Sequence, residues 1–115
     1  MTGDENMIKQ ALFIVAAASL AVALPVHAKG GNAAAGKAKS TSCAACHGET
    51  GVSAIPAFPI LAGQKSDYLY HALKAYKTGK RTNQLMAEQV KPLSDQDMRD
   101  LAAFYSQQKG LTLKY

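Results

Sequence analysis

The sequence contains no tryptophan and only two cysteines, Cys43 and Cys46, which lie within one pentapeptide. Cysteines this close together exclude a framework of disulfides between distant segments. Alternating runs of β-branched residues are also absent, so nothing indicates a β-sheet. The 115 residues are enough for one domain, and a domain this small buries a thin core. Such domains often depend on a metal or a cofactor for stability.

No hydrophobic run is long enough to span a bilayer comfortably, which takes roughly 20 residues. The longest low-polarity stretch, residues 11–24, is followed by Pro25 and then by Ala28. An apolar core, a breaker and a small residue in this order are typical of a secretory signal peptide.

We therefore predict a signal peptide at residues 1–28, cleaved after Ala28, and an exported domain at residues 29–115. The acidic residues before the apolar stretch are atypical, and a translation start at Met7 would remove them. A retained N-terminal anchor helix is the alternative.

Helical patterns occupy most of the exported region, and the predicted class is all-α. Asn32 is a suitable N-cap for an Ala-rich helix over residues 33 to about 42. Apolar residues at helical spacing predict a second helix over residues 67–78. Ser94, followed by an acidic capping-box residue at position 97, predicts a third helix that ends at Gly110. The inner face of that third helix comprises Met98, Leu101, Ala102 and Tyr105.

Two connecting segments separate these helices. Residues 48–63 are rich in Gly and Pro, which predicts an irregular loop. We expect this loop to direct four apolar side chains inward: Ile55, Phe58, Ile60 and Leu61. Residues 80–93 predict a link with a short helix before Pro92.

The run Cys43-Ala44-Ala45-Cys46-His47 is the attachment signature of c-type haem. Two thiols with this spacing add across the two vinyl groups of the haem as thioethers. The adjacent His47 then lies over the ring and ligates the iron through Nε2. The sequence therefore predicts one covalent haem c with its iron.

Two other interpretations of the cysteine pair are weaker. A redox dithiol usually follows a strand of a thioredoxin-like unit, and no strand is predicted here. A zinc site needs four ligands, and no second Cys or His pair completes it.

The second axial ligand is predicted to be Met86, which lies in the link, outside the predicted helices and any apolar face. A thioether favours ferrous iron and raises the reduction potential. Met98 belongs to the inner face of the last helix and is predicted to pack in the core. His71 lies on a polar helix face. The alternatives are an open sixth position or ligation by His71.

The chain resembles a class I, single-haem cytochrome c, and most of all one haem domain of the bacterial two-haem cytochromes c. The resemblance covers nearly all of the exported region. The residues that carry it are Gly36, Cys43 to Gly48, Phe58-Pro59-Ile60-Leu61-Ala62-Gly63-Gln64, Tyr68-Leu69, Gly79-Lys80-Arg81, Met86, Leu93-Ser94-Asp95 and Leu101-Ala102-Ala103-Phe104-Tyr105. Only one attachment motif is present, so a second haem is not expected.

The resemblance implies a cytochrome c fold, with three main helices and loops wrapped around the haem. It implies that Gly36 lets the first helix cross closely against the last. It also implies that the Pro59 carbonyl accepts a hydrogen bond from His47 Nδ1, and that Met86 is the distal ligand. Arg81 would lie near a haem propionate.

These features predict a soluble periplasmic carrier of single electrons, not an enzyme. The formal net charge of +5 suits redox partners with acidic docking patches, such as a quinol-oxidising complex or a terminal oxidase or reductase. Cations near the haem edge would steer those partners: Lys65, Lys74, Lys77, Lys80, Arg81 and Lys91. The lysines are scattered without interleaved aromatics, which disfavours nucleic acid. A haem enzyme with an open sixth position and a subunit docked to a dehydrogenase are the rival functions.

Overall fold

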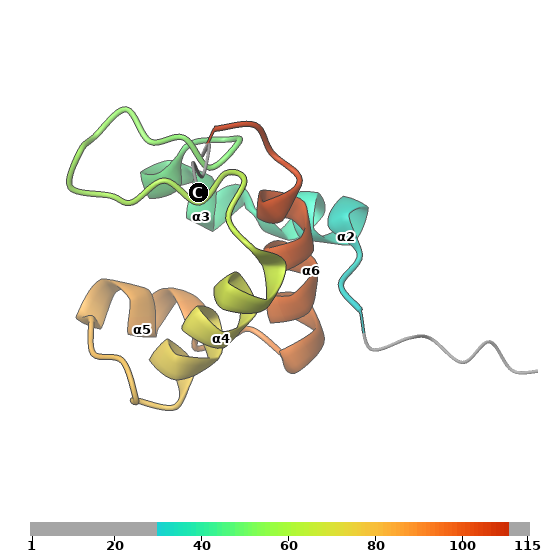
Figure 1. Ribbon diagram of the computed structural model, residues 1–115. Helices are drawn as coiled ribbons and strands as arrows, with labels where there is room; N and C mark the ends of the chain where they lie inside the picture. Colours follow the sequence, from blue (N-terminus) through green and yellow to red (C-terminus); the bar gives the residue numbers. More distant parts are fainter. Residues whose placement is uncertain (1–29, 111–115) are drawn as a thin grey trace, which may run out of the picture.

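A computed structural model describes residues 30–110, which form five helices joined by loops (Figure 1). No strand occurs within this range, so the all-α prediction is confirmed. Within the same range, no helix has the length and apolar character needed to cross a bilayer. The predicted signal peptide, residues 1–28, lies outside the described residues. The helices are α2 (Ala33–Lys39), α3 (Thr41–His47), α4 (Ser66–Lys77), α5 (Gln84–Val90) and α6 (Asp95–Ser106).

Helix α6 forms the centre of the described structure, and both α2 and α4 pack against it. It begins with the predicted capping box between Ser94 and Asp97. Leu101 is only 1% exposed, and burial of a leucine side chain contributes about 2 kcal/mol. The predicted inner face is confirmed, because all four of its residues are buried: Met98, Leu101, Ala102 and Tyr105.

Helix α2 crosses α6 at Gly36, where the two backbones are in direct contact. A Cβ atom added at Gly36 would lie 2.0 Å from the Asp100 carbonyl oxygen and 2.8 Å from the Phe104 Cβ. No side chain fits at such distances, so only glycine allows this approach. The crossing implied by the family resemblance is confirmed.

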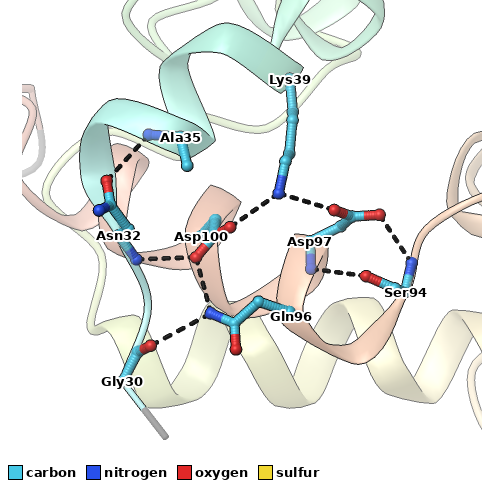
Figure 2. Close-up of polar contacts among 8 residues, drawn as sticks. All are labelled: Gly30, Asn32, Ala35, Lys39, Ser94, Gln96, Asp97 and Asp100. Carbon is cyan, nitrogen blue, oxygen red and sulfur yellow. Dashed lines mark hydrogen bonds and ion pairs between the residues drawn. The ribbon is translucent and has the colours of Figure 1, made fainter. Parts of the chain in front are cut away.

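A polar network fixes the same two helices relative to each other (Figure 2). The Asp100 carboxylate is buried and accepts hydrogen bonds from the Asn32 backbone N–H at 2.8 Å and from Gln96 Nε2 at 2.8 Å. Lys39 Nζ lies 2.7 Å from both Asp100 Oδ2 and Asp97 Oδ1. A buried carboxylate without such partners would be strongly unfavourable, so the network requires α2 and α6 to meet in one register.

The first predicted helix is in fact two helices, because regular helical structure is interrupted at Ser40. The Ser40 side chain donates to the Lys37 carbonyl at 2.8 Å, and its backbone N–H donates to the same carbonyl. A serine that bonds the preceding turn competes with regular helical bonding. Helix α3 therefore starts afresh at Thr41. The last helix also ends earlier than predicted, at Ser106 instead of Gly110.

The loop at residues 48–63 is irregular, as predicted. The protein itself half-buries Leu61 and Phe58, and it leaves Ile55 and Ile60 52% and 44% exposed. The backbone N–H groups of residues 61 and 62 both bond the Gly51 carbonyl and close the base of the loop. The residues between extend away from the helical core (Figure 1).

The Gly36 crossing can be tested with Gly36→Ala. We expect this substitution to lower the free energy of unfolding by about 3 kcal/mol, because the methyl group forces α2 away from α6. Urea denaturation of the haem-loaded protein, followed by circular dichroism, measures the change. Gly30→Ala is the control, because nothing lies within 4 Å of a Cβ at that position. Equal stability of both variants would show that the crossing is not tight.

The network predicts loss of stability in acid. Hydrogen bonding by Lys39 lowers the pKa of Asp97 to about 2, and the pKa of an unfolded aspartate is about 3.9. The ionised Asp97 thus stabilises the fold fully above about pH 4, and this contribution disappears as the pH falls towards 2.

Unfolding free energies measured between pH 7 and pH 2 check this expectation. We expect Asp97→Asn to be less stable than wild type at pH 7 and to approach it at pH 2. A difference that stays constant with pH would contradict the assigned role of the carboxylate.

Candidate haem site

Helix α3 presents the cysteines and His47 of the attachment motif together. Cys43 and Cys46 are three residues apart on this helix, so their side chains lie on neighbouring positions of one face. Both are half-buried and neither forms a disulfide. The two thiols are therefore arranged to bond one flat group from the same side.

The His47 ring is held in place by Pro59, a residue of the loop that follows α3. His47 is the last residue of α3 and is only 7% exposed. Its Nδ1 donates to the Pro59 carbonyl oxygen at 2.8 Å, which is the hydrogen bond that the resemblance implies. Because the proton resides on Nδ1, Nε2 carries the lone pair that can ligate a metal. The Phe58 ring contacts the imidazole edge, with ring centroids 6.3 Å apart.

The chain turns sharply after His47 and returns over α3. Gly48 has a φ of 81°, and a Cβ at this position would lie 2.2 Å from the Val52 carbonyl oxygen. Ser53 then donates its hydroxyl to the Cys46 carbonyl at 2.9 Å. Sequence reasoning missed this contribution of Ser53, because no motif marks a serine at that position. The turn and the bond hold the loop beside the attachment motif.

The proposed distal ligand Met86 lies in a helix, so the prediction that it lies in a non-helical link is wrong. Asn83 caps α5 by accepting the Met86 backbone N–H at 3.0 Å. The residues that follow, Gln-Leu-Met-Ala-Glu, are good helix formers, and this signal could have been recognised in the sequence. The predicted short helix before Pro92 is confirmed. Met86 itself is half-buried on α5.

The two other candidate ligands occupy the positions predicted for them. Met98 is 3% exposed and belongs to the core cluster with Leu101 and Phe104. His71 is exposed on α4, with its ring centroid 5.1 Å from that of Tyr70. Of the two methionines within residues 30–110, Met86 is therefore the one that is not part of the core cluster.

Comparison with known proteins identifies the family. The family profile described as cytochrome c matches residues 33–109. The chain belongs to the cytochrome c family.

Similar proteins include a cytochrome c4 from Pseudomonas aeruginosa, 49% identical over 79 residues, which are 69% of this chain and 39% of that protein. Cytochrome c-554(548) from Halomonas halodenitrificans is 44% identical over 82 residues, covering 69% of this chain and 99% of that protein. The crystal structure of reduced recombinant cytochrome c4 from Pseudomonas stutzeri has 43% identity and a TM-score of 0.67. That match covers 70% of this chain and 47% of the other. The chain thus spans less than half of either cytochrome c4 and nearly all of the Halomonas protein.

The cytochrome c fold and its cofactor, one covalent haem c with iron, are thereby shown. The residues present also fit this group chemically. Two thiols, an imidazole with an available Nε2 and a partly apolar loop converge on the end of α3. Large apolar side chains exposed in this loop and at the start of α5 offer a surface for a flat apolar ring. They are Val52, Ile55, Ile60 and Leu85.

The alternative interpretations of the cysteine pair find no support in the described part of the chain. Burial raises the pKa of the Cys43 thiol, whereas reactive dithiols have a lowered pKa. Within residues 30–110, no group of three or more His, Cys, Asp or Glu side chains is placed to hold a metal ion, so the zinc interpretation has no ligand set there.

The predicted docking cations are largely on the surface around α4 and α5, but several have intramolecular partners. The Arg81 guanidinium lies 4.8 Å from the centre of the Tyr76 ring, and Lys74 lies over the Tyr70 ring at 5.6 Å. Lys77 donates to two backbone carbonyls. Lys80 and Lys91 are exposed and make no side-chain hydrogen bond or ion pair within the described range. Their charges are therefore accessible to a partner.

The attachment role of the cysteines can be tested by replacing both with alanine. We expect the haem of wild type to stay with the protein in acidic acetone, because thioether bonds are not broken, and the haem of the double variant to be extracted. Absorbance of the two phases measures the partition. Ser42→Ala, a neighbouring change on α3, is the control and should retain its haem. A double variant that keeps its haem would contradict covalent attachment at these positions.

Proposed function

We propose that this cytochrome c is a soluble periplasmic electron carrier in which His47 and Met86 are the axial ligands of the haem iron. The observation that carries the proposal is the His47–Pro59 hydrogen bond beside the two thiols. This bond leaves Nε2 of the imidazole available to ligate the iron of a haem that the two thiols would hold. When bound, the haem accepts and releases one electron at its iron.

The protein residues keep the two oxidation states structurally alike. The Pro59 carbonyl fixes the orientation and tautomer of His47 and increases its donor strength. A thioether from Met86 would complete the coordination and favour the ferrous state. The close-packed core beneath the site, including Leu101 and Phe104, resists rearrangement during transfer.

Partner binding would depend on the accessible cations near α4 and α5. Lys80 and Lys91 are exposed, and we propose that they attract acidic patches on redox partners. Partners of the quinol-oxidising and terminal oxidase or reductase classes fit this chemistry. Such encounters are transient and weaken as salt concentration rises.

The predicted signal peptide supports the periplasmic location in this proposal. Residues 1–28 have the order of segments expected of a signal peptide, and bacterial haem c is attached outside the cytoplasm. Fractionation of cells expressing the full chain tests this point. Recovery of the haem protein in the cytoplasm would contradict it.

Ligation by Met86 is tested with the Met86→Ala variant. The oxidised wild type should show the near-infrared sulfur-to-iron charge-transfer band, and the variant should lose it completely because alanine has no thioether. Its reduction potential should also fall, since His/Met ligation favours ferrous iron.

Met98→Leu is the matched control, because it replaces the buried methionine with a side chain of similar volume. We expect the band and the potential to remain. A wild-type protein without the band would instead favour a haem enzyme or a gas-binding protein with an open sixth position.

A further inference from the structure

The backbone of Met86 is held directly by the side chain of Asn83. The Asn83 carboxamide oxygen accepts the Met86 N–H at 3.0 Å, and this bond forms the N-cap of α5. An N-cap determines where a helix begins and therefore the direction in which its first turn presents side chains. The backbone that the Asn83 cap holds is thus that of Met86, the residue proposed to ligate iron.

The other end of α5 is held by Lys77, the last residue of α4. Its Nζ donates to the Lys91 carbonyl at 3.1 Å and also to the Leu93 carbonyl. Lys91 is the C-cap residue of α5, and carbonyls at a helix C-terminus lack partners within the helix. A cation there satisfies these carbonyls and complements the helix dipole. Lys77 therefore ties α4 to the segment that ends α5.

Helix α5 depends on such attachments. Like α2 and α3 it has seven residues, and a helix this short is not stable by itself in water. It packs chiefly against α4, and its buried anchor is Val90, which is 1% exposed. The bonds from Asn83 and Lys77 act at the two ends of this helix, whose one buried residue is Val90.

We propose that Asn83 and Lys77 are positioning residues that hold Met86 at the iron. The proposal rests on the proposed function, in which Met86 is the axial ligand. Loss of either bond favours local opening of α5, which withdraws the thioether while α2 and α6 remain packed. In this proposal Lys77 is not one of the cations that bind a partner, because its ammonium group bonds the carbonyls that follow α5.

Binding of imidazole to the oxidised, haem-loaded protein tests the proposal, since an external ligand enters only when Met86 leaves. The variants are Asn83→Ala and Lys77→Met. The matched controls are Asn83→Ser, which keeps a capping oxygen, and Lys80→Met, which removes an exposed charge on the same surface. Visible spectra give the apparent affinity, and the sulfur-to-iron band reports the ligand already bound.

We expect imidazole to bind about fivefold more tightly to Asn83→Ala and Lys77→Met, which corresponds to loss of one cap or hydrogen bond. Both controls should stay within about twofold of wild type. Hydrogen exchange of the Met86 amide should quicken in Asn83→Ala and not in Asn83→Ser.

The possible failures are distinguishable. Wild-type affinity in both Asn83→Ala and Lys77→Met, with the band present in wild type, overturns the positioning roles and leaves Met86 as the ligand. Absence of the band in wild type overturns the proposed function and this inference with it. A shift in Lys80→Met as large as in Lys77→Met would assign the effect to surface charge and also overturn the positioning role.

Discussion

The contact of α2 with α6 at Gly36 is the constraint on which the rest of the described structure depends. Only one residue, Ser40, separates the end of α2 from the start of α3. The position of α2 on α6 therefore determines where α3 begins and where its thiols and imidazole lie. Since a Cβ at Gly36 would meet backbone and not a movable side chain, the two helices have little freedom to slide.

The carboxylate of Asp100 restricts this contact to one relative register of α2 and α6. Apolar packing alone is roughly proportional to area and tolerates alternative registers. A buried carboxylate with donors from α2, from α6 and from the segment before α2 is satisfied in one arrangement only (Figure 2). We infer that Asp100 contributes more to the uniqueness of the helix pairing than to its free energy, because desolvation offsets much of the attraction to Lys39.

The sequence was sufficient to predict the all-α class, the capping box at Ser94 and the core role of Met98, because these depend on local pattern. The family resemblance supplied the Gly36 crossing and the Pro59 carbonyl, which pair residues far apart in sequence. The break at Ser40 depends on a hydroxyl that bonds the preceding turn, and periodicity does not reveal it.

The site shows the same division. The cysteines and His47 could be predicted as haem-binding residues from their spacing, because attachment of a c-type haem requires these residues to be close together in sequence. The cap on α5 was present in the sequence as an asparagine before helix formers, but the polar character of the segment obscured it. Closure of the loop on Gly51 could not be predicted, since it depends on tertiary hydrogen bonds.

The attachment of α5 to α4 has a consequence for how such proteins diversify. The segment that would set the reduction potential is separate from the helices that set global stability. With Met86 as the proposed ligand, substitutions in α5 would alter the properties of the iron without loosening the Gly36 crossing, and core substitutions would leave the ligand unchanged. One scaffold can therefore yield carriers with different driving forces through changes in a single short segment.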